Sequence, residues 1–133
     1  GPDAPDVLSD DVLQPGQASC LYHQETDQEG FLVLSGECLL LVEEEERRLE
    51  AWDYFHCPPN TKHVFVGAGT GPCAILMIGA RSKDGGVQYP VSALAREHTA
   101  GVDQATDSPK VAYAPFPAWE DRPNPWSDIT GTK

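Results

Sequence analysis

Short apolar runs separated by turn residues dominate the chain between residues 15 and 80. The runs are Ala18 to His23, Phe31 to Leu34, Cys38 to Val42, Leu49 to Cys57, Val64 to Val66 and Cys73 to Ile78. Proline, glycine, serine or asparagine clusters follow most of them, and such clusters mark turns. Short strands in this rhythm are typical of an antiparallel barrel or sandwich, so we predict an all-β fold over about residues 10–80.

A run of charged residues, Glu43 to Arg48, follows the apolar stretch that ends at Val42. A charged segment between two strands is typical of the solvated tip of a β-hairpin. The segment contains no glycine, which a tight two-residue turn favours, so we expect a looser loop at this tip.

Several strands are apolar at both odd and even positions, and these positions include Leu32, Leu34, Leu39, Leu41, Val64 and Val66. Because successive side chains of a strand point to opposite faces, such strands need a second covering layer. The candidates for that layer are a second barrel, the C-terminal part of the chain, or both. We expect a homodimer, since twofold pairs are the commonest assembly, and a monomer covered by its own tail is the alternative.

The composition changes after Ala80. Ser92 and the helix-forming residues that follow it predict one short helix with a serine N-cap between residues 90 and 100. From Gly101 onward, prolines alternate with the aromatic residues Tyr113, Phe116, Trp119 and Trp126. We expect this arm to lie extended on its own barrel or on a partner's, and a proline-rich recognition peptide is the alternative.

These patterns divide the chain into three parts. We predict a loosely held N-terminal segment or edge strand at residues 1–12, a barrel core at residues 13–81, and a helix with an extended arm at residues 82–133.

The formal net charge of −12 argues against nucleic acid and anionic membranes as partners, because both prefer a basic surface. No apolar run approaches the length of a membrane span, and no secretory signal is present. The 4 cysteines form no Cys-x-x-Cys pair, so we interpret them as buried free thiols of a cytoplasmic protein. The alternatives are a disulfide or a thiol near a metal, for which Cys57 is the candidate because it lies close before His63.

Metal-binding side chains cluster at both ends of residues 21–66. His23 and Glu25 alternate along one strand, so their side chains lie on the same face. Glu29 shares a face with the apolar residues two and four positions further on, where an unpaired carboxylate is costly. His63 immediately precedes the apolar run near the end of the stretch. Two imidazoles and two carboxylates that converge would bind a divalent cation, and this binding would offset the cost.

The two clusters resemble the two motifs that define the cupins, a family of small β-barrels. The positions of the first motif are Gly16, His23, Glu25, Glu29 and Gly36. Here a glutamate replaces the motif's second histidine, and the first glycine lies one residue further from the first histidine than usual. The positions of the second motif are Trp52, Pro58, Asn60, His63 and Gly67, of which the proline and the histidine keep the family residue. The gap between the motifs is a usual short cupin gap.

The resemblance implies a cupin-type antiparallel β-barrel, also called a double-stranded β-helix or jelly roll. It also implies a mononuclear divalent metal ion (iron, manganese, zinc or nickel) and a small-molecule ligand. The implied metal ligands are His23, Glu25, Glu29 and His63. The aromatic candidates for the pocket wall are Tyr22, Tyr54, Phe55 and Phe65. His56 and His98 fit neither motif, and we interpret both as structural.

Cupins include oxygenases, isomerases, epimerases, decarboxylases, storage proteins and sugar-sensing domains, so the fold does not select an activity. Three functions remain open: a small-molecule metalloenzyme with oxygenase-like or isomerase-like chemistry, a non-catalytic module that binds a metal or small ligand, and a structural dimeric barrel. The sequence shows no separate acid–base pair or nucleophile that would name a reaction.

Overall fold

The computed structural model describes residues 6–80 and 82–116, and within them strands predominate. The strands are β1 (Asp6–Leu13), β2 (Gln24–Glu25), β3 (Glu29–Ser35), β4 (Glu37–Val42), β5 (Glu45–Glu50), β6 (Tyr54–Cys57), β7 (His63–Ala68), β8 (Cys73–Ala80) and β9 (Val87–Gln88). The helices are α1 (Ala93–Glu97) and α2 (Pro109–Tyr113). The all-β prediction is confirmed, and α2 is a second short helix that the sequence did not predict. No helix among the described residues has the length and apolar character needed to span a membrane.

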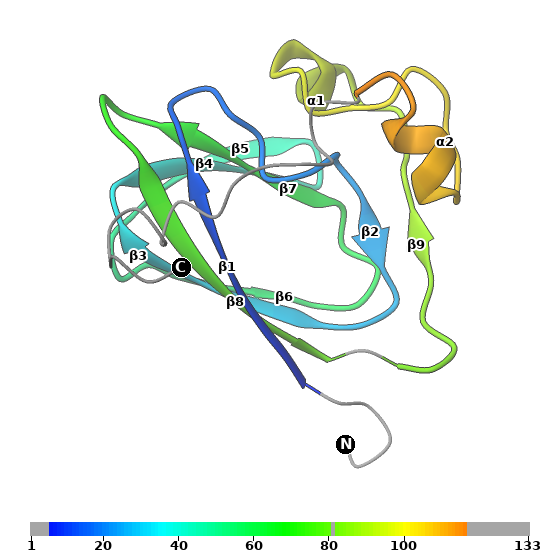
Figure 1. Ribbon diagram of the computed structural model, residues 1–133, viewed down its shortest axis with the longest axis horizontal. Helices are drawn as coiled ribbons and strands as arrows, with labels where there is room; N and C mark the ends of the chain where they lie inside the picture. The colour runs from blue at the N-terminus through cyan, green and yellow to red at the C-terminus, as the bar shows by residue number, and fades with distance from the viewer. Residues whose placement is uncertain (1–5, 81, 117–133) are drawn as a thin grey trace, which may run out of the picture.

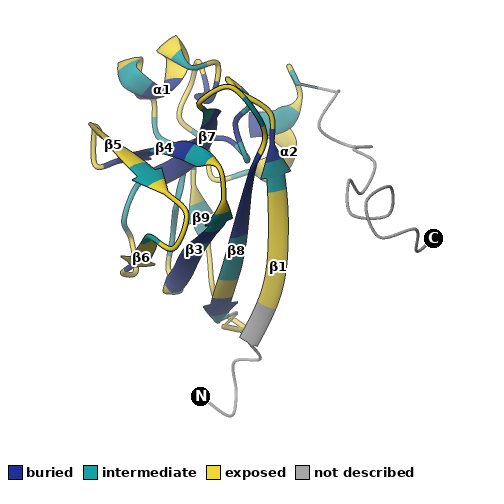
Figure 2. Cartoon of the chain, turned by 90° about the vertical axis from the view of Figure 1, so that its left-hand side faces the viewer, coloured by how far each residue is buried: buried dark blue, intermediate teal, exposed yellow. Residues whose placement is uncertain are grey.

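Two antiparallel sheets face each other across the interior (Figure 1). One sheet has the strand order β1-β8-β3-β6 and the other β5-β4-β7, while β2 and β9 form a short ribbon beside α2. Strands β3 and β7 are largely buried, whereas the edge strands β1 and β5 are exposed (Figure 2). Strand β1 pairs with β8 along its whole length and forms an edge of its sheet.

Alternating side chains fill one end of the barrel. In β3, Phe31 and Val33 are buried in the interior, whereas Leu32 and Leu34 are half-buried on the outer face. The inner core combines residues of both sheets: Leu13, Phe31, Val33, Cys38, Leu40, Val42, Cys57, Phe65, Cys73 and Ile75. At the opposite end of β3 the inward position belongs to Glu29, so polar chemistry replaces apolar packing there.

A second core covers the outer face of β4 and β7. Leu41 and Val64 pack there with Ala95 of α1 and with Ala100. The hydroxyl of Ser92 caps α1 by accepting a hydrogen bond from the Ala95 amide at 3.1 Å. Strands that are apolar on both faces were expected to need a covering layer. For this sheet, the chain's own helix α1 is that layer.

The hairpin between β4 and β5 turns more tightly than expected, because only Glu43 and Glu44 separate the paired strands. Their φ angles of +47° and +66° are strained for residues with a side chain. Hydrogen bonds to distant segments offset this strain. The Glu43 amide donates to the Lys62 carbonyl at 2.9 Å, and the Glu44 amide donates to the Tyr22 hydroxyl at 3.1 Å. The expectation of a looser loop was therefore wrong, since these partners replace glycine.

Two other residues with positive φ stand where the cupin motif has glycine. Trp52 has φ +74° and Asn60 has φ +60°. Asparagine adopts this conformation readily, but tryptophan does so at a cost. Gly67 stands where the motif has asparagine, and a Cβ atom there would collide with the Gln14 carbonyl oxygen. The residues that depart from the motif therefore stand at positions with special backbone requirements, and the barrel fold is kept at each of them.

The described part of the C-terminal arm packs on its own chain. Tyr89 pairs with Thr106 through two main-chain hydrogen bonds of 2.8 and 3.1 Å. The hydroxyl of Tyr113 in α2 accepts a hydrogen bond from the Leu21 amide at 3.0 Å. The aromatic residues Trp119 and Trp126, also expected to lie on a barrel, are outside the described residues.

Candidate metal centre

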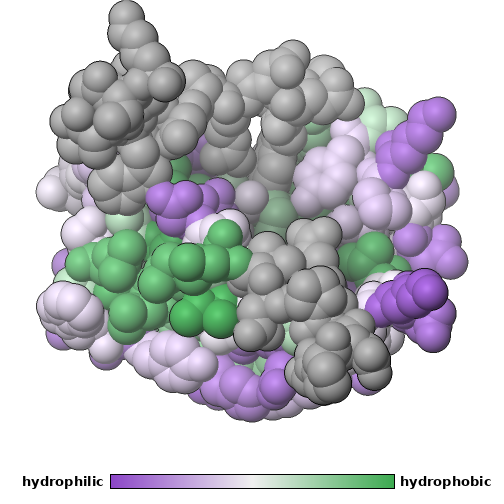
Figure 3. Space-filling view, turned by 60° about the horizontal axis from the view of Figure 1, so that its bottom comes forward, coloured by the Kyte–Doolittle hydropathy of each residue, from purple (hydrophilic) through white to green (hydrophobic). Residues whose placement is uncertain are grey.

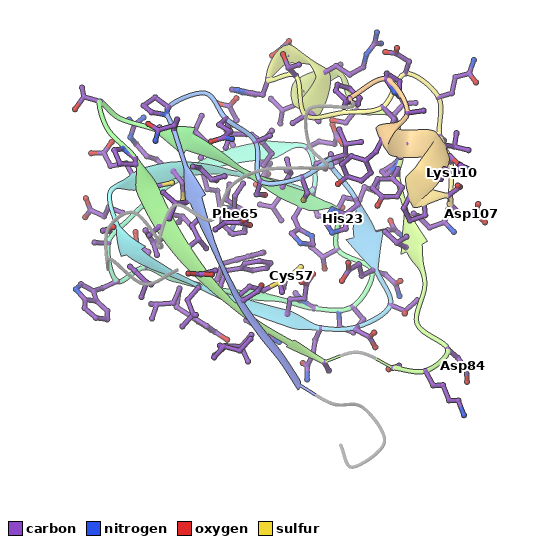
Figure 4. All side chains as sticks on the ribbon, viewed as in Figure 1. His23, Cys57, Phe65, Asp84, Asp107 and Lys110 are labelled. Carbon is purple, nitrogen blue, oxygen red and sulfur yellow. The ribbon has the colours of Figure 1, made fainter. Side chains whose placement is uncertain are left out.

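Main-chain pairing brings the two motif histidines together. His23 lies just before β2 and His63 begins β7, and their main chains form an antiparallel bridge. The His63 amide donates to the His23 carbonyl at 2.9 Å, and the reverse hydrogen bond measures 3.2 Å. Residues that face each other in this way project their side chains to the same side, so the ring centroids are only 4.8 Å apart. In Figure 4, His23 projects into the space between the sheets that also holds Cys57 and Phe65.

Each imidazole is oriented by a hydrogen bond through Nδ1. The Nδ1 of His23 lies 2.7 Å from the Leu21 carbonyl oxygen, and the Nδ1 of His63 lies 2.8 Å from the Thr61 carbonyl oxygen. A carbonyl only accepts, so Nδ1 carries a proton in each ring, and Nε2 is the nitrogen that could bind a metal ion. Metal-binding histidines are commonly oriented by such bonds.

Glu29 supplies a buried carboxylate at the start of β3, where the residue is 8% exposed. Its Oε1 lies 3.4 Å from Nε2 of His63 and has no hydrogen-bond partner among the described residues. Gly79 stands opposite in β8, where a Cβ would make ordinary van der Waals contact with the Glu29 side chain. A buried oxygen without a partner is costly, and a cation bound beside it would remove this cost.

Glu25 lies at the rim of the same site. It belongs to β2, its side chain is partly exposed, and its Oε1 lies 3.5 Å from Nε2 of His23. The hydrogen bond with His23 holds the pKa of Glu25 below its ordinary value of 4.5, although burial acts in the opposite direction. Burial lowers the pKa of His23, but Cys20 and Glu25 raise it by more, so that it lies well above 6.5. Without a metal, His23 and Glu25 therefore form an ion pair.

The donor atoms of this centre suit a divalent first-row metal ion. His23, Glu29 and His63 place one ligand atom each within 4.8 Å of one another, and Glu25 offers a further oxygen beside His23. Imidazole nitrogens and carboxylate oxygens are common ligands of iron, manganese, zinc and nickel. Two carboxylates would balance the charge of such an ion, and the ion would satisfy the unpartnered oxygen of Glu29.

A cavity of about 250 Å³ opens beside these residues. Its lining includes the four candidate ligands and the aromatic residues Phe31, Phe65, Tyr89 and Tyr113. Apart from the two histidines, the charged side chains among the described lining residues are acidic, and Asp11 of β1 joins the two glutamates. The cavity is large enough for a small organic molecule next to the centre.

Of the four aromatic residues expected at the pocket wall, Phe65 lines the cavity. Tyr22 is fully buried elsewhere and holds the turn between β4 and β5. Tyr54 lies on the outer face of β6, and Phe55 packs on the inner core. His56 and His98 also lie away from the cavity, with Nε2 of His56 3.1 Å from Gln28 and that of His98 2.7 Å from Glu46.

The lining residues that were not singled out as pocket residues from the sequence include Cys20, Tyr89 and Tyr113. The thiol of Cys20 lies 3.6 Å from Nδ1 of His23, and that of Cys57 lies 3.4 Å from Nδ1 of His63. Besides Cys57, which the sequence suggested as a thiol near a metal, a second thiol at Cys20 therefore lies beside the candidate centre. The aromatic pattern of the arm pointed to packing on a barrel, but nothing local in the sequence assigned Tyr89 and Tyr113 to the cavity.

Comparison with known proteins agrees with this architecture. Residues 11–79 match the family model described as "Cupin domain". No curated protein matches the chain significantly. Among solved structures, an RmlC-like cupin family protein with a double-stranded β-helix fold from Methanocaldococcus jannaschii is 15% identical, with a TM-score of 0.54 over 59% of this chain and 72% of that chain.

Two further solved structures carry the name of an enzyme. A provisionally named sugar phosphate isomerase from Acidithiobacillus ferrooxidans is 26% identical, with a TM-score of 0.59 over 62% of this chain and 54% of that chain. A sugar phosphate isomerase from a cupin superfamily, from Silicibacter pomeroyi, is 24% identical, with a TM-score of 0.61 over 64% of this chain and 56% of that chain. This chain therefore spans little more than half the length of either isomerase structure.

Proposed function

This chain belongs to the cupin family, and we propose that it binds a divalent metal ion and uses it to act on a small oxygen-bearing organic molecule. The observation that carries the proposal is the buried Oε1 of Glu29, which lies 3.4 Å from Nε2 of His63 and lacks a hydrogen-bond partner among the described residues. The ligands would be His23, Glu25, Glu29 and His63.

The surroundings of the centre support a site that also holds an organic ligand. The cavity of about 250 Å³ adjoins all four proposed ligands, and its wall combines aromatic rings with hydroxyl groups. When bound, the ion would supply a Lewis acid that polarises a carbonyl or hydroxyl oxygen of the substrate. The chain's own residues would orient that molecule and keep water from its apolar side.

We further propose that the reaction is an isomerisation of a small hydroxy-carbonyl compound. The 26% identity to the sugar phosphate isomerase of Acidithiobacillus ferrooxidans supports this class, over the shared barrel only. An oxygenase is the alternative if the ion is iron. A non-catalytic module that binds a small ligand is the second alternative, because the similarity to the isomerase covers the barrel alone.

The test of the metal site is elemental analysis of protein purified without a metal-affinity step. We expect about one divalent ion per chain in the wild type and a loss of most of it in His63→Ala. His56→Ala is the matched control, since this exposed histidine lies outside the cavity, and it should retain the metal. Wild-type metal content in His63→Ala would refute the site.

The test of the reaction uses metal-loaded protein and a panel of aldoses, ketoses and their phosphate esters, followed by proton NMR. Isomerisation predicts interconversion of one aldose–ketose pair, and solvent deuterium should enter the product at carbon. Metal binding without turnover of any panel member would favour the non-catalytic module. Oxygen consumption by the iron-loaded protein would favour the oxygenase.

We also propose that two copies of the chain pair through the outer face of the sheet that contains β1, β8, β3 and β6. Leu8, Tyr54 and Ile78 are 69%, 61% and 50% exposed on this face, and Leu32 and Leu76 lie between them, half-buried. In Figure 3, which brings this side forward, hydrophobic side chains gather in a patch. Apolar patches of this kind commonly mark protein interfaces.

We also propose a cytoplasmic location, which the free thiols of all four cysteines support.

A further inference from the structure

Two tyrosines of the C-terminal arm form a hydrogen-bonded pair at the wall of the cavity. Tyr89 follows β9 and Tyr113 ends α2, and both line the cavity. Their rings are nearly perpendicular with centroids 5.9 Å apart, and a hydrogen bond joins their hydroxyl groups. Neither residue belongs to the two cupin motifs, so the arm contributes these two hydroxyl groups to the cavity.

One order of hydrogen bonds through this pair leaves a proton free for the cavity. The Tyr113 hydroxyl accepts a hydrogen bond from the Leu21 amide at 3.0 Å, and its own proton can be donated to the Tyr89 oxygen. The Tyr89 proton then remains for a group inside the cavity. Aligned donors of this kind polarise one another, which makes the last hydroxyl a stronger donor.

Tyr89 is close enough to the metal centre to contact a molecule bound there. Its ring centroid lies 6.0 Å from that of His23, and the residue is buried. A tyrosine hydroxyl ordinarily titrates at about pH 10, so it is protonated at physiological pH. Tyr89 therefore presents a neutral hydrogen-bond donor beside the proposed ligands.

We propose that Tyr89 is a substrate-binding residue whose hydroxyl donates a hydrogen bond to an oxygen of the molecule held at the metal centre. This inference rests on the proposed function. It also narrows the substrate class, because the molecule needs one oxygen for the metal and a second, adjacent oxygen that accepts the proton of Tyr89. α-Hydroxy acids and α-hydroxy carbonyl compounds meet this requirement.

The experiment uses the full chain loaded with cobalt(II), whose visible absorption reports on its ligands. Glycolate serves as a probe with two adjacent oxygens, and imidazole serves as a probe that binds metal through nitrogen and offers no oxygen acceptor. Each probe is titrated into the wild type and the variants Tyr89→Phe, Tyr113→Phe and Tyr22→Phe. Tyr22→Phe is the matched control, because its buried hydroxyl serves the hairpin turn outside the cavity.

We expect Tyr89→Phe to weaken glycolate binding by about five-fold, the equivalent of one hydrogen bond, and to leave imidazole binding within about two-fold. Tyr113→Phe should show a smaller loss for glycolate, since it removes only the polarising partner. Tyr22→Phe should match the wild type for both probes. Cobalt affinity should be the same in all four proteins.

Equal glycolate affinity in Tyr89→Phe and the wild type would overturn the inference, as would a loss that is the same for both probes. A wild type that binds cobalt but not glycolate would also overturn it while leaving the metal site intact. Failure of the wild type to bind cobalt would instead remove the proposed function, and the inference with it.

Discussion

His23 and His63 lie directly opposite each other in an antiparallel main-chain pair, with 4.8 Å between their ring centroids. The position of each imidazole is therefore set by two main-chain hydrogen bonds and by a bond from Nδ1 to a nearby carbonyl. Substitution of either side chain leaves the main-chain pair in place. Variants of this centre are thus expected to fold and to report on metal binding itself.

The first prediction concerns stabilisation by metal. Divalent manganese or zinc should raise the melting temperature of the wild type, because binding to the native state alone adds stability, about 2.7 kcal/mol at a hundredfold excess over Kd. Glu29→Gln should abolish this rise, since the amide cannot balance the charge of the ion. The measurement is thermal unfolding with metal and with EDTA.

Glu37→Gln is the control for that comparison. This carboxylate pairs with Arg48 at 2.8 Å on the outer surface, away from the cavity. The metal-dependent rise should persist in Glu37→Gln. A rise of wild-type size in Glu29→Gln would contradict the assignment of Glu29 as a ligand.

The second prediction concerns the pH dependence of the metal-free protein. Burial lowers the pKa of His23, but Cys20 and Glu25 raise it by more, so the pKa lies above its ordinary value of 6.5. The contribution of His23 to stability is therefore present below pH 6.5 and is lost as the pH rises through the raised pKa. The pKa of Glu25 is lowered below 4.5 by its hydrogen bond with His23, so its contribution is present above pH 4.5 and is lost as the pH falls through the lowered value. The ion pair should therefore stabilise the protein most between pH 4.5 and 6.5.

Urea unfolding in EDTA between pH 5 and 9 measures this effect. The wild type should lose stability above pH 6.5 more steeply than His23→Gln. Metal affinity should show the opposite trend and increase with pH, because the ion competes with the proton on His23. Parallel stability curves for the two proteins would show that His23 does not carry the effect.

The third prediction concerns the strained tryptophan at the second motif. Trp52 has φ +74° and an exposed side chain, so its conformation is costly and little packing depends on it. Trp52→Gly should be more stable than Trp52→Ala by about 1 kcal/mol, because glycine alone adopts this φ without strain. The measurement is the free energy of unfolding of both variants. Equal stability would mean that the backbone relaxes at this position in the alanine variant.

The strand pattern and the spacing of the candidate metal-binding residues were readable from the sequence because both depend on local alternation. Glu29 shows this well: its parity with the buried positions of β3 indicated an inward carboxylate, and the residue is buried. The turn at Glu43 and Glu44 was not readable. Its strain is offset by Lys62 and Tyr22, which come from distant parts of the chain, and no local rule predicts such partners.

The same dependence on contacts between distant segments explains why the aromatic residues of the cavity wall were not predicted correctly. Tyr22 and Tyr54 lie next to motif residues in the sequence, yet one holds a turn and the other lies on the outer face. Tyr89 and Tyr113 lie far from both motifs, and only the fold of the arm brings them to the cavity. Proximity in sequence was therefore a poor guide to the aromatic residues of the site.

The fourth prediction concerns assembly. Light scattering at micromolar concentration should give the mass of a dimer for the wild type. Ile78→Asp should shift it towards the monomer, because a carboxylate in an apolar interface is costly. Val111→Asp is the control: Val111 is 60% exposed, but it lies on α2, away from the proposed interface. A strictly monomeric wild type, or equal dissociation by both substitutions, would contradict the proposed face.

The hydrogen bond from the Leu21 amide to the Tyr113 hydroxyl joins the arm to the segment that leads into His23. The family match ends at residue 79, so Tyr113 and its contact with Leu21 lie outside the part of the chain that resembles the family. A gene fragment cut at the end of that match would encode both motif histidines and both glutamates but not Tyr89 and Tyr113 of the cavity wall. Recombination or engineering that exchanges arms between such barrels would therefore offer a route to new ligand preferences on an unchanged metal centre.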